Sequence, residues 1–272
     1  MALIHSTLRK WLDAKRAGSE EKEAEAIQKL EALLTDQNAA GIIRSLSAEE
    51  FQTPFCLAAI RHWTSGDPVQ ASNWLAARPD ATEDDAWAAA QGWAAHGNEL
   101  QGYLTQLPDT AWKQALLQEA GAQMSASDPA GAIELARQMD PGNGRTSLLQ
   151  STAGDWIATD PRAAIAWINS VSDPALREQL VASAAASYAL TDPAQAAAWV
   201  ASSAPSDGVM KGAALNIAQT WVTQDPAAAA NWVSQFPNGE TRNAAVAIVS
   251  KYWQQVNPGA ATAWMQKLSA GN

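Results

Sequence analysis

The residue types that most often perform chemistry in proteins are sparse in this chain. Its three histidines, His5, His62 and His96, lie far apart, and none has a second ligand at the spacing that a metal site needs. Cys56 stands in an apolar run, which is typical of a packed thiol. No Gly-rich phosphate loop follows a strand, and no serine stands in a nucleophile elbow. We therefore expect no metal, no cofactor and no catalytic residue.

Carboxylates recur at a regular interval, and such a row could attract cations or supply acid–base pairs. Its members are Asp67, Asp128, Asp160, Asp192 and Asp225, each followed by proline. An Asp before Pro indicates the start of a helix, because the carboxylate accepts hydrogen bonds from the first turn and proline fits the first helical position. Packed helices lie about 10 Å apart, too far for neighbouring carboxylates to share a proton. The row predicts helix capping.

Basic residues form a second row, near the start of each following helix. Its members are Lys113, Arg145, Arg177 and Arg242, with Met210-Lys211 in one copy. A cation is poorly placed for the dipole at the start of a helix, so it needs another partner. These side chains either hydrogen-bond the last carbonyls of the preceding short helix or form a ladder that binds a ligand. The carbonyl interpretation is favoured, and the ladder remains open.

The chain contains thirteen tryptophans, and their rings are the most abundant side chains suited to binding a ligand. Ten of them occupy repeated positions, where large rings are expected in the core. Trp11, Trp87 and Trp112 lie outside the pattern, which makes them candidates for an exposed surface that stacks on sugar rings or grips a peptide. Trp112 also matches the helix-start position of Phe51 and Leu176.

All of these residues belong to one repeated phrase: aromatic, three residues, Asp-Pro, five residues, Trp. The anchor positions recur about every 32 residues, at Asp67, Gly97, Asp128, Asp160, Asp192, Asp225 and Asn257. An alanine stands four residues after most anchors, at Ala71, Ala132, Ala164, Ala196, Ala229 and Ala261. It shares a helix face with the Trp three residues later, so we expect close helix packing there.

The phrase predicts a long helix, an Asp-Pro turn, a short helix and a Pro/Gly turn in each copy. The expected helical hairpins cover residues 48–77, 81–106, 110–138, 143–170, 174–202, 208–235 and 240–268. No segment shows the alternation of a strand. The predicted fold is all-α, an α-solenoid (a right-handed α-α superhelix) of about seven hairpins over residues 47–272.

Residues 1–46 do not follow the period. Two helices are expected there, over 6–15 and 20–34, the second amphipathic with Ala26, Ile27, Leu30, Leu33 and Leu34 on its apolar side. A capping box at Ser47–Glu50 marks a further helix start. Repeat arrays need an end unit with a polar outer face, so this segment is predicted to be an N-terminal helical cap.

The formal net charge of −10 bears on the partner. Nucleic acid and anionic membranes need a basic footprint, so both are disfavoured, and a basic peptide or protein is modestly favoured. No apolar run is long enough to predict a membrane span, and the first twenty residues do not have the pattern of a signal peptide. We expect a soluble protein, either cytoplasmic or periplasmic after removal of a leader. The oligomeric state is not predicted.

The phrase Trp221-Val-Thr-Gln-Asp225-Pro226-Ala-Ala-Ala229-Ala-Asn-Trp232 carries a resemblance. Over residues 48–268 the pattern resembles tetratricopeptide-like α-α superhelical repeats in architecture, although their period is 34 residues and their Trp, Gly, Tyr and Ala are placed differently. It looks more like the tandem Trp-x3-Asp-Pro-x2-Ala-x2-Trp repeats of uncharacterised bacterial proteins. The resemblance implies a bacterial origin and a scaffold role, and it transfers no catalytic residue.

Two binding functions remain open at this stage, beside a purely structural spacer or self-assembling module. The first is a scaffold that binds a protein or peptide, basic or neutral, along the concave surface of the array. The second is an enzyme or carbohydrate-binding protein with a Trp-lined site near residues 81–138, where the period slips and Asp84 and Asp85 supply carboxylates. The candidate binding residues are Trp11, Trp87, Trp112, Lys113, Arg145, Arg177 and Arg242.

Overall fold

The chain folds into helices in a computed structural model, which confirms the predicted all-α class. The structure describes residues 1–51, 53–93, 96, 99–203 and 205–270, and these residues form eighteen helices and no strand. Contacts between residues divide the chain into two units, Met1–Arg145 and Thr146–Asn272. The predicted boundary between a cap and an array at residues 46 and 47 stays a prediction. Gly97, the expected anchor of the second copy, lies outside the described residues.

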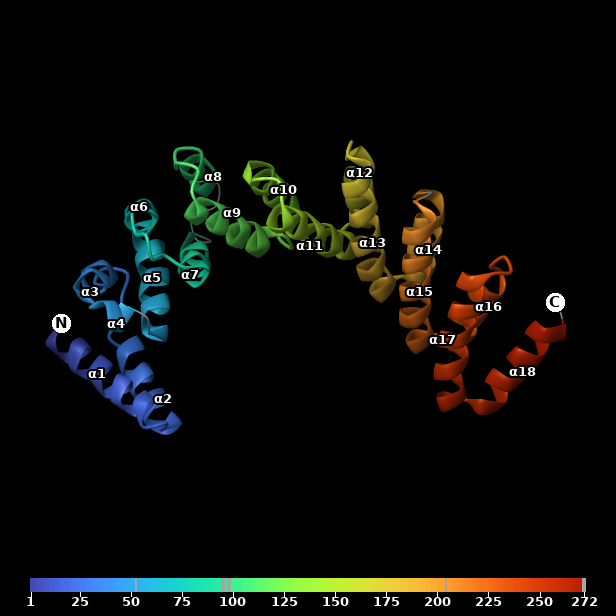
Figure 1. The fold of residues 1–272 in the computed structure, drawn as a ribbon, viewed down its shortest axis with the longest axis horizontal. Coiled ribbons are helices and arrows are strands. Elements are labelled where there is room, and N and C mark those ends of the chain that lie inside the picture. Colours follow the sequence, from blue (N-terminus) through green and yellow to red (C-terminus); the bar gives the residue numbers. More distant parts are fainter. Residues whose placement is uncertain (52, 94–95, 97–98, 204, 271–272) are drawn as a thin grey trace. The chain divides into compact units, whose positions relative to one another are not determined.

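The first unit contains the helices labelled α1 to α10 in Figure 1 and the first residues of α11. Helices α5, α7 and α9 pack against one another in succession, α6 packs against α5 and α7, and α10 packs against α9. Helices α2 and α3 both contact α5, while α1 packs on α2. The bounds are α1 (Ala2–Arg16), α2 (Glu20–Glu31), α3 (Ala39–Ser45), α4 (Ala48–Phe51), α5 (Pro54–Gly66), α6 (Pro68–Ala76), α7 (Glu83–Trp93), α8 (Glu99–Leu104), α9 (Ala111–Met124) and α10 (Pro129–Gln138).

The second unit repeats the same kind of packing. Helices α13, α15 and α17 contact one another in succession, and α14, α16 and α18 each pack against the long helix that precedes them. Helices α14 and α16 also contact the next long helix. The bounds are α11 (Asn143–Thr159), α12 (Pro161–Ser170), α13 (Pro174–Thr191), α14 (Pro193–Ser203), α15 (Asp207–Gln224), α16 (Pro226–Ser234), α17 (Glu240–Val256) and α18 (Pro258–Ala270).

The Asp-Pro turns connect each long helix to its short helix through two sets of hydrogen bonds. The backbone N–H of the anchor donates to the carbonyl four residues earlier, as Asp160 does to Trp156 at 2.7 Å. The anchor's side chain then accepts from the N–H three residues later, at 2.9–3.1 Å in every Asp-Pro copy. Asn257 does the same for Ala260. The predicted capping role of the carboxylates is therefore confirmed.

The alanine and aromatic positions of the phrase make the core between helices. All six repeat alanines are fully buried, as the close-packing prediction requires. Where both aromatics are Trp, the two rings lie 5.5–5.9 Å apart, as in Trp63–Trp74 and Trp253–Trp264. In the second copy Trp93 stacks on Tyr103 at 5.2 Å, so Tyr103 supplies the second ring of that pair. Leu104 is buried beside it.

Helix placement before residue 60 differs from expectation in two ways. Helix α3 was not predicted, because its seven residues are too few to show a clear period. The helix expected from residue 48 is divided into α4 and α5, since Pro54 has no N–H to donate and its ring clashes with the carbonyl four residues earlier. The Ser47–Glu50 capping box is confirmed, with reciprocal bonds of 2.9 and 3.3 Å.

In the described part of the chain, no helix has both the length and the continuous apolar character needed to cross a bilayer. This agrees with the expectation of no membrane span.

Candidate functional site

The side chains of the basic row bond different kinds of partner. The Lys113 ammonium donates to the carbonyl of Leu107 at 3.4 Å, and the Arg177 guanidinium donates to the carbonyl of Val171 at 3.0 Å. Both acceptors follow a short helix, so the carbonyl interpretation is confirmed for these two residues. Arg242 bonds the side chain of Asn238. The Lys211 ammonium donates to the Glu240 carboxylate, at the start of the next long helix, at 2.5 Å.

Arg145 differs from the rest of its row. It makes no hydrogen bond or ion pair with any residue that the structure describes, and it is partly buried. In the copy with Met210-Lys211, Met210 occupies the corresponding place and cannot donate to a carbonyl. Arg145 and Met210 each line a cavity.

The first cavity, called here the polar cavity, lies in the first unit and has a volume of about 450 Å³. It is bordered by the starts of α7 and α9 and by the turn before α11. Its charged and polar wall comes from Thr82, Glu83, Gln114, Asp140 and Arg145. Gln114 is already engaged, since its carbonyl accepts from the Asp140 N–H at 2.9 Å and its amide donates to Asp109. Two sequence-predicted residues, Trp112 and Arg145, therefore meet at this cavity.

Carboxylates next to the polar cavity have unusual environments. Asp85 is buried, and it caps α7 by accepting from the N–H and hydroxyl of Thr82 at 2.9 and 3.0 Å. Burial raises the pKa of Asp85 despite these hydrogen bonds. On α9, burial raises the pKa of Glu119, and the nearby carboxylates of Glu83 and Asp84 raise it further. Negative charge thus accumulates where α7 begins.

The second cavity, called here the apolar cavity, lies in the second unit and has a volume of about 420 Å³. Val200, Met210, Ile217, Trp232 and Phe236 make most of its wall apolar, while Asn238, Glu240 and Thr241 add polar groups. The Trp232 and Phe236 rings meet edge to face with centroids 4.7 Å apart, which fixes both rings. The charged residue on its rim is Glu240, whose carboxylate is paired with Lys211. No residue of this cavity was expected as a site from the sequence, although Met210 in place of a basic residue was a signal.

The three tryptophans outside the repeat do not form one surface. Trp11 is only 3% exposed and Trp112 only 7%, because both lie on the buried faces of their helices. Their expected exposure is wrong. Trp112 lies near the start of α9, whereas Phe51, the position matched to it, is also buried but ends α4. Trp87 is 43% exposed on α7, so it alone of the three offers its ring to solvent.

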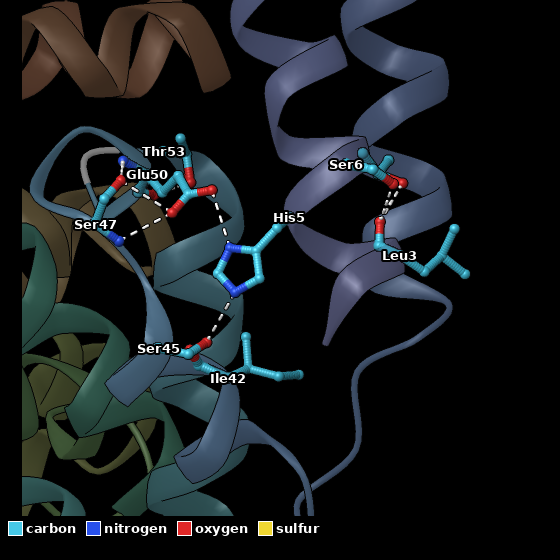
Figure 2. Close-up of polar contacts among 9 residues, drawn as sticks. Leu3, His5, Ser6, Ile42, Ser45, Ser47, Glu50 and Thr53 are labelled. Carbon is cyan, nitrogen blue, oxygen red and sulfur yellow. Dashed lines mark hydrogen bonds and ion pairs between the residues drawn. The ribbon is translucent and has the colours of Figure 1, made fainter.

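One polar cluster was not foreseen, and Figure 2 shows it around His5. The imidazole Nδ1 lies 3.0 Å from a carboxylate oxygen of Glu50, and Nε2 lies 3.3 Å from the Ser45 hydroxyl. Burial raises the pKa of Glu50, but hydrogen bonds from the Ser47 N–H, His5 and the Ser47 hydroxyl outweigh it and leave the pKa below its usual value. The order serine, histidine, carboxylate is that of a hydrolase triad.

The hydrogen bonding of this cluster argues against a nucleophile. The Ser45 hydroxyl donates its single proton to the Ile42 carbonyl at 2.7 Å, so the proton is not shared with His5. Ser45 also borders neither the polar cavity nor the apolar cavity. The cluster connects α1 with α3 and α4, and its role is structural.

The remaining histidines also bond residues that are distant in the sequence. His62 Nδ1 lies 2.7 Å from Asp36, and a ring nitrogen of His96 lies 3.0 Å from the Ser65 carbonyl. Among the residues described, no three His, Cys, Asp or Glu side chains gather as a metal site would require. Cys56 is buried, and burial raises the pKa of its thiol.

Comparisons with protein-family models, with curated proteins and with solved structures find no match to this chain. The function is therefore inferred from the geometry described above.

Proposed function

We propose that the chain is a protein-binding scaffold, an α-solenoid of about seven helical hairpins similar to the tetratricopeptide-like repeats, which holds a segment of another protein. Within each unit, successive long helices pack side by side and the short helices pack behind them. This is the local packing on which stacked helical repeats are built.

The observation that carries the proposal is the apolar cavity of the second unit. At about 420 Å³ it is large enough for a bulky side chain, and most of its wall is formed by aliphatic and aromatic groups. Because Glu240 is already paired with Lys211, the cavity holds no free charge that would select a polar metabolite. Binding energy would come from removing an apolar side chain from water.

The residues of the apolar cavity suit a protein partner in particular. Trp232, Phe236 and Met210 are partly buried, so each still presents surface at the cavity. Aromatic residues dominate binding hot spots between proteins, and methionine adapts its shape to different apolar partners. The occupant we propose is a large apolar side chain, such as Leu, Phe or Trp, on a segment of the partner.

Selection of short random peptides on the full chain tests the proposal. We expect enrichment of peptides that carry a large apolar residue, and a loss in their affinity of about tenfold or more for Met210→Glu, because the new carboxylate would be desolvated by the bound side chain. Fluorescence anisotropy with the selected peptides provides the measurement.

Val256→Glu is the matched control, since Val256 is exposed on α17 and lies outside the cavity. It introduces the same charge in the same unit and should leave the affinity unchanged. Equal affinity for wild type and Met210→Glu, or no enrichment of apolar residues, would contradict the proposal.

A carbohydrate-binding or enzymatic function is the second candidate, and the polar cavity favours it. That cavity includes residues within 81–118 of the predicted region and extends beyond it to Arg145, and Trp112 and Glu83 also border it. Titration calorimetry with soluble oligosaccharides would test this candidate, using Arg145→Ala and Glu83→Gln as variants that alter the wall. Binding that both variants abolish would favour it over the scaffold.

A further inference from the structure

The exposed face of α7 presents an aromatic ring between acidic groups. Trp87 is 43% exposed, whereas the other twelve tryptophans are buried or partly buried. Glu83 and Asp84 precede it by four and three residues, so all three side chains share one face of the helix. Both carboxylates are exposed as well.

A third carboxylate approaches this face from the neighbouring helix. Glu119 of α9 is partly buried, and its pKa is raised by burial and by the charges of Glu83 and Asp84. In the described part of the chain, none of the three carboxylates forms an ion pair. By contrast, Glu134 is paired with Arg137 and Glu240 with Lys211.

Four other rings of the first unit each have a cation from the chain itself. The Arg44 guanidinium lies 4.8 Å from the Trp63 ring centre, and Lys15 lies 4.9 Å from Trp11. Arg78 lies 4.8 Å from Trp74 and also covers Phe51. Trp87 has no such cation among the described residues. The Trp87 ring and the three carboxylates therefore form a surface to which a cation from a partner would bind.

The same surface continues into the polar cavity. Glu83 belongs both to the face of Trp87 and to the cavity wall, which also contains Asp140 and Arg145. If a partner side chain bound at Trp87, the next residue of the partner segment would lie beside the polar cavity of about 450 Å³.

We propose that Glu83, Asp84, Trp87 and Glu119 form the docking surface for a lysine or arginine side chain of a protein segment. The aliphatic stem lies on the indole ring, and the charged end is held by the carboxylates. This inference deepens the proposed function, because it names the chemistry of the partner, and it rests on that function. Charge complementarity selects this occupant.

A labelled oligolysine peptide is the probe, and an oligoglutamine peptide of the same length is its neutral counterpart. We expect anisotropy at physiological salt to show binding of oligolysine only. Trp87→Ala should weaken it about fivefold, and Trp87→Phe should retain most of the affinity. The combined variant Glu83→Gln, Asp84→Asn, Glu119→Gln should weaken it about tenfold or more.

Glu20→Gln, Glu21→Gln, Glu31→Gln is the matched control, because it removes three exposed carboxylates from α2 and changes the net charge equally. It should change the affinity less than about twofold. An equal loss in the control would show that only net charge matters and would overturn the inference, as would unchanged binding by Trp87→Ala. Circular dichroism of every variant shows whether the helices are retained.

The outcome is distinguishable from that of the scaffold proposal. Met210→Glu should bind oligolysine as the wild type does, because the apolar cavity lies in the other unit. Failure of oligolysine to bind overturns this inference while selected apolar peptides still test the scaffold. Loss of apolar selectivity with retained oligolysine binding would instead contradict the apolar site.

Discussion

The polar cavity of the first unit and the apolar cavity of the second unit arise at similar places in the repeat. Each includes a residue of the basic row that does not bond a carbonyl, Arg145 in one case and Met210 in the other. Where Lys113 and Arg177 keep that bond, neither residue lies at the apolar cavity or the polar cavity. The carbonyl bond alone does not decide whether a cavity forms, because the polar cavity borders α9 although Lys113 of that helix bonds the Leu107 carbonyl.

The difference in chemistry between the two cavities comes from the residues that line them. Glu83, Asp140 and Arg145 make the first wall charged, while Ile217, Trp232 and Phe236 make the second wall mostly apolar. The capped turns and buried alanines are the same in both units. The same repeated helical framework thus contains two cavities of different chemistry.

The largest expected effect tests that repeated framework. Ala132→Met in the first unit and Ala229→Met in the second should each lower the free energy of unfolding by about 1–3 kcal/mol, because both alanines are fully buried between helices. Urea denaturation measures the change, and Ala198→Met on the exposed side of α14 is the control. Tolerance of methionine at one site but not at the other would show that the units are not packed alike.

A smaller effect separates the members of the basic row. Lys113→Met and Arg177→Met should each lower the free energy of unfolding by about 1 kcal/mol, because each removes a charged hydrogen bond to a carbonyl. Arg145→Met should change it by less than about 0.5 kcal/mol, since Arg145 has no such bond. Thermal denaturation of the three variants gives the comparison. A loss at Arg145 as large as at Arg177 would contradict the account.

The smallest effect is a difference in pH dependence between two glutamates. The folded-state pKa of Glu119 is raised, so this residue favours folding below the ordinary value of 4.5, and that contribution is lost as the pH rises through the folded pKa. Glu119→Gln should therefore stabilise the protein at pH 7 by a few tenths of a kcal/mol and have no effect near pH 3.

Glu240 should behave in the opposite way. Its hydrogen bond and ion pair with Lys211 lower its pKa, so its contribution is present above 4.5 and is lost as the pH falls through the folded pKa. Glu240→Gln should slightly destabilise the protein at pH 7 and not at pH 3. Urea midpoints at the two pH values test both variants, and the same sign for both would contradict the assigned environments.

Local chemistry explains what could be predicted from the sequence. The capping carboxylates and the Lys113 and Arg177 bonds join residues no more than six positions apart, and the same residues recur in several copies. Because the pattern repeats, the helices and the roles of these side chains could be predicted from the sequence. The buried alanines follow from the same period.

Contacts between distant segments explain what could not be predicted. Trp11 and Trp112 resemble Trp87 in lying outside the phrase, but their burial depends on which helices cover them. His5 meets Glu50 across 45 residues, and no local pattern places these two side chains together. The apolar cavity likewise combines residues from α14, α15, α16 and the turn before α17. Its position followed from the packing of several helices.

The indole N–H signals of the thirteen tryptophans provide the most direct test of binding by two different surfaces. We would titrate the full chain with oligolysine and then with a selected apolar peptide, and follow these signals by two-dimensional NMR. The account predicts that oligolysine moves the Trp87 signal, that the apolar peptide moves the Trp232 signal, and that Trp63 and Trp93 stay unchanged. Movement of the same signals by both peptides, or of neither Trp87 nor Trp232, would contradict it.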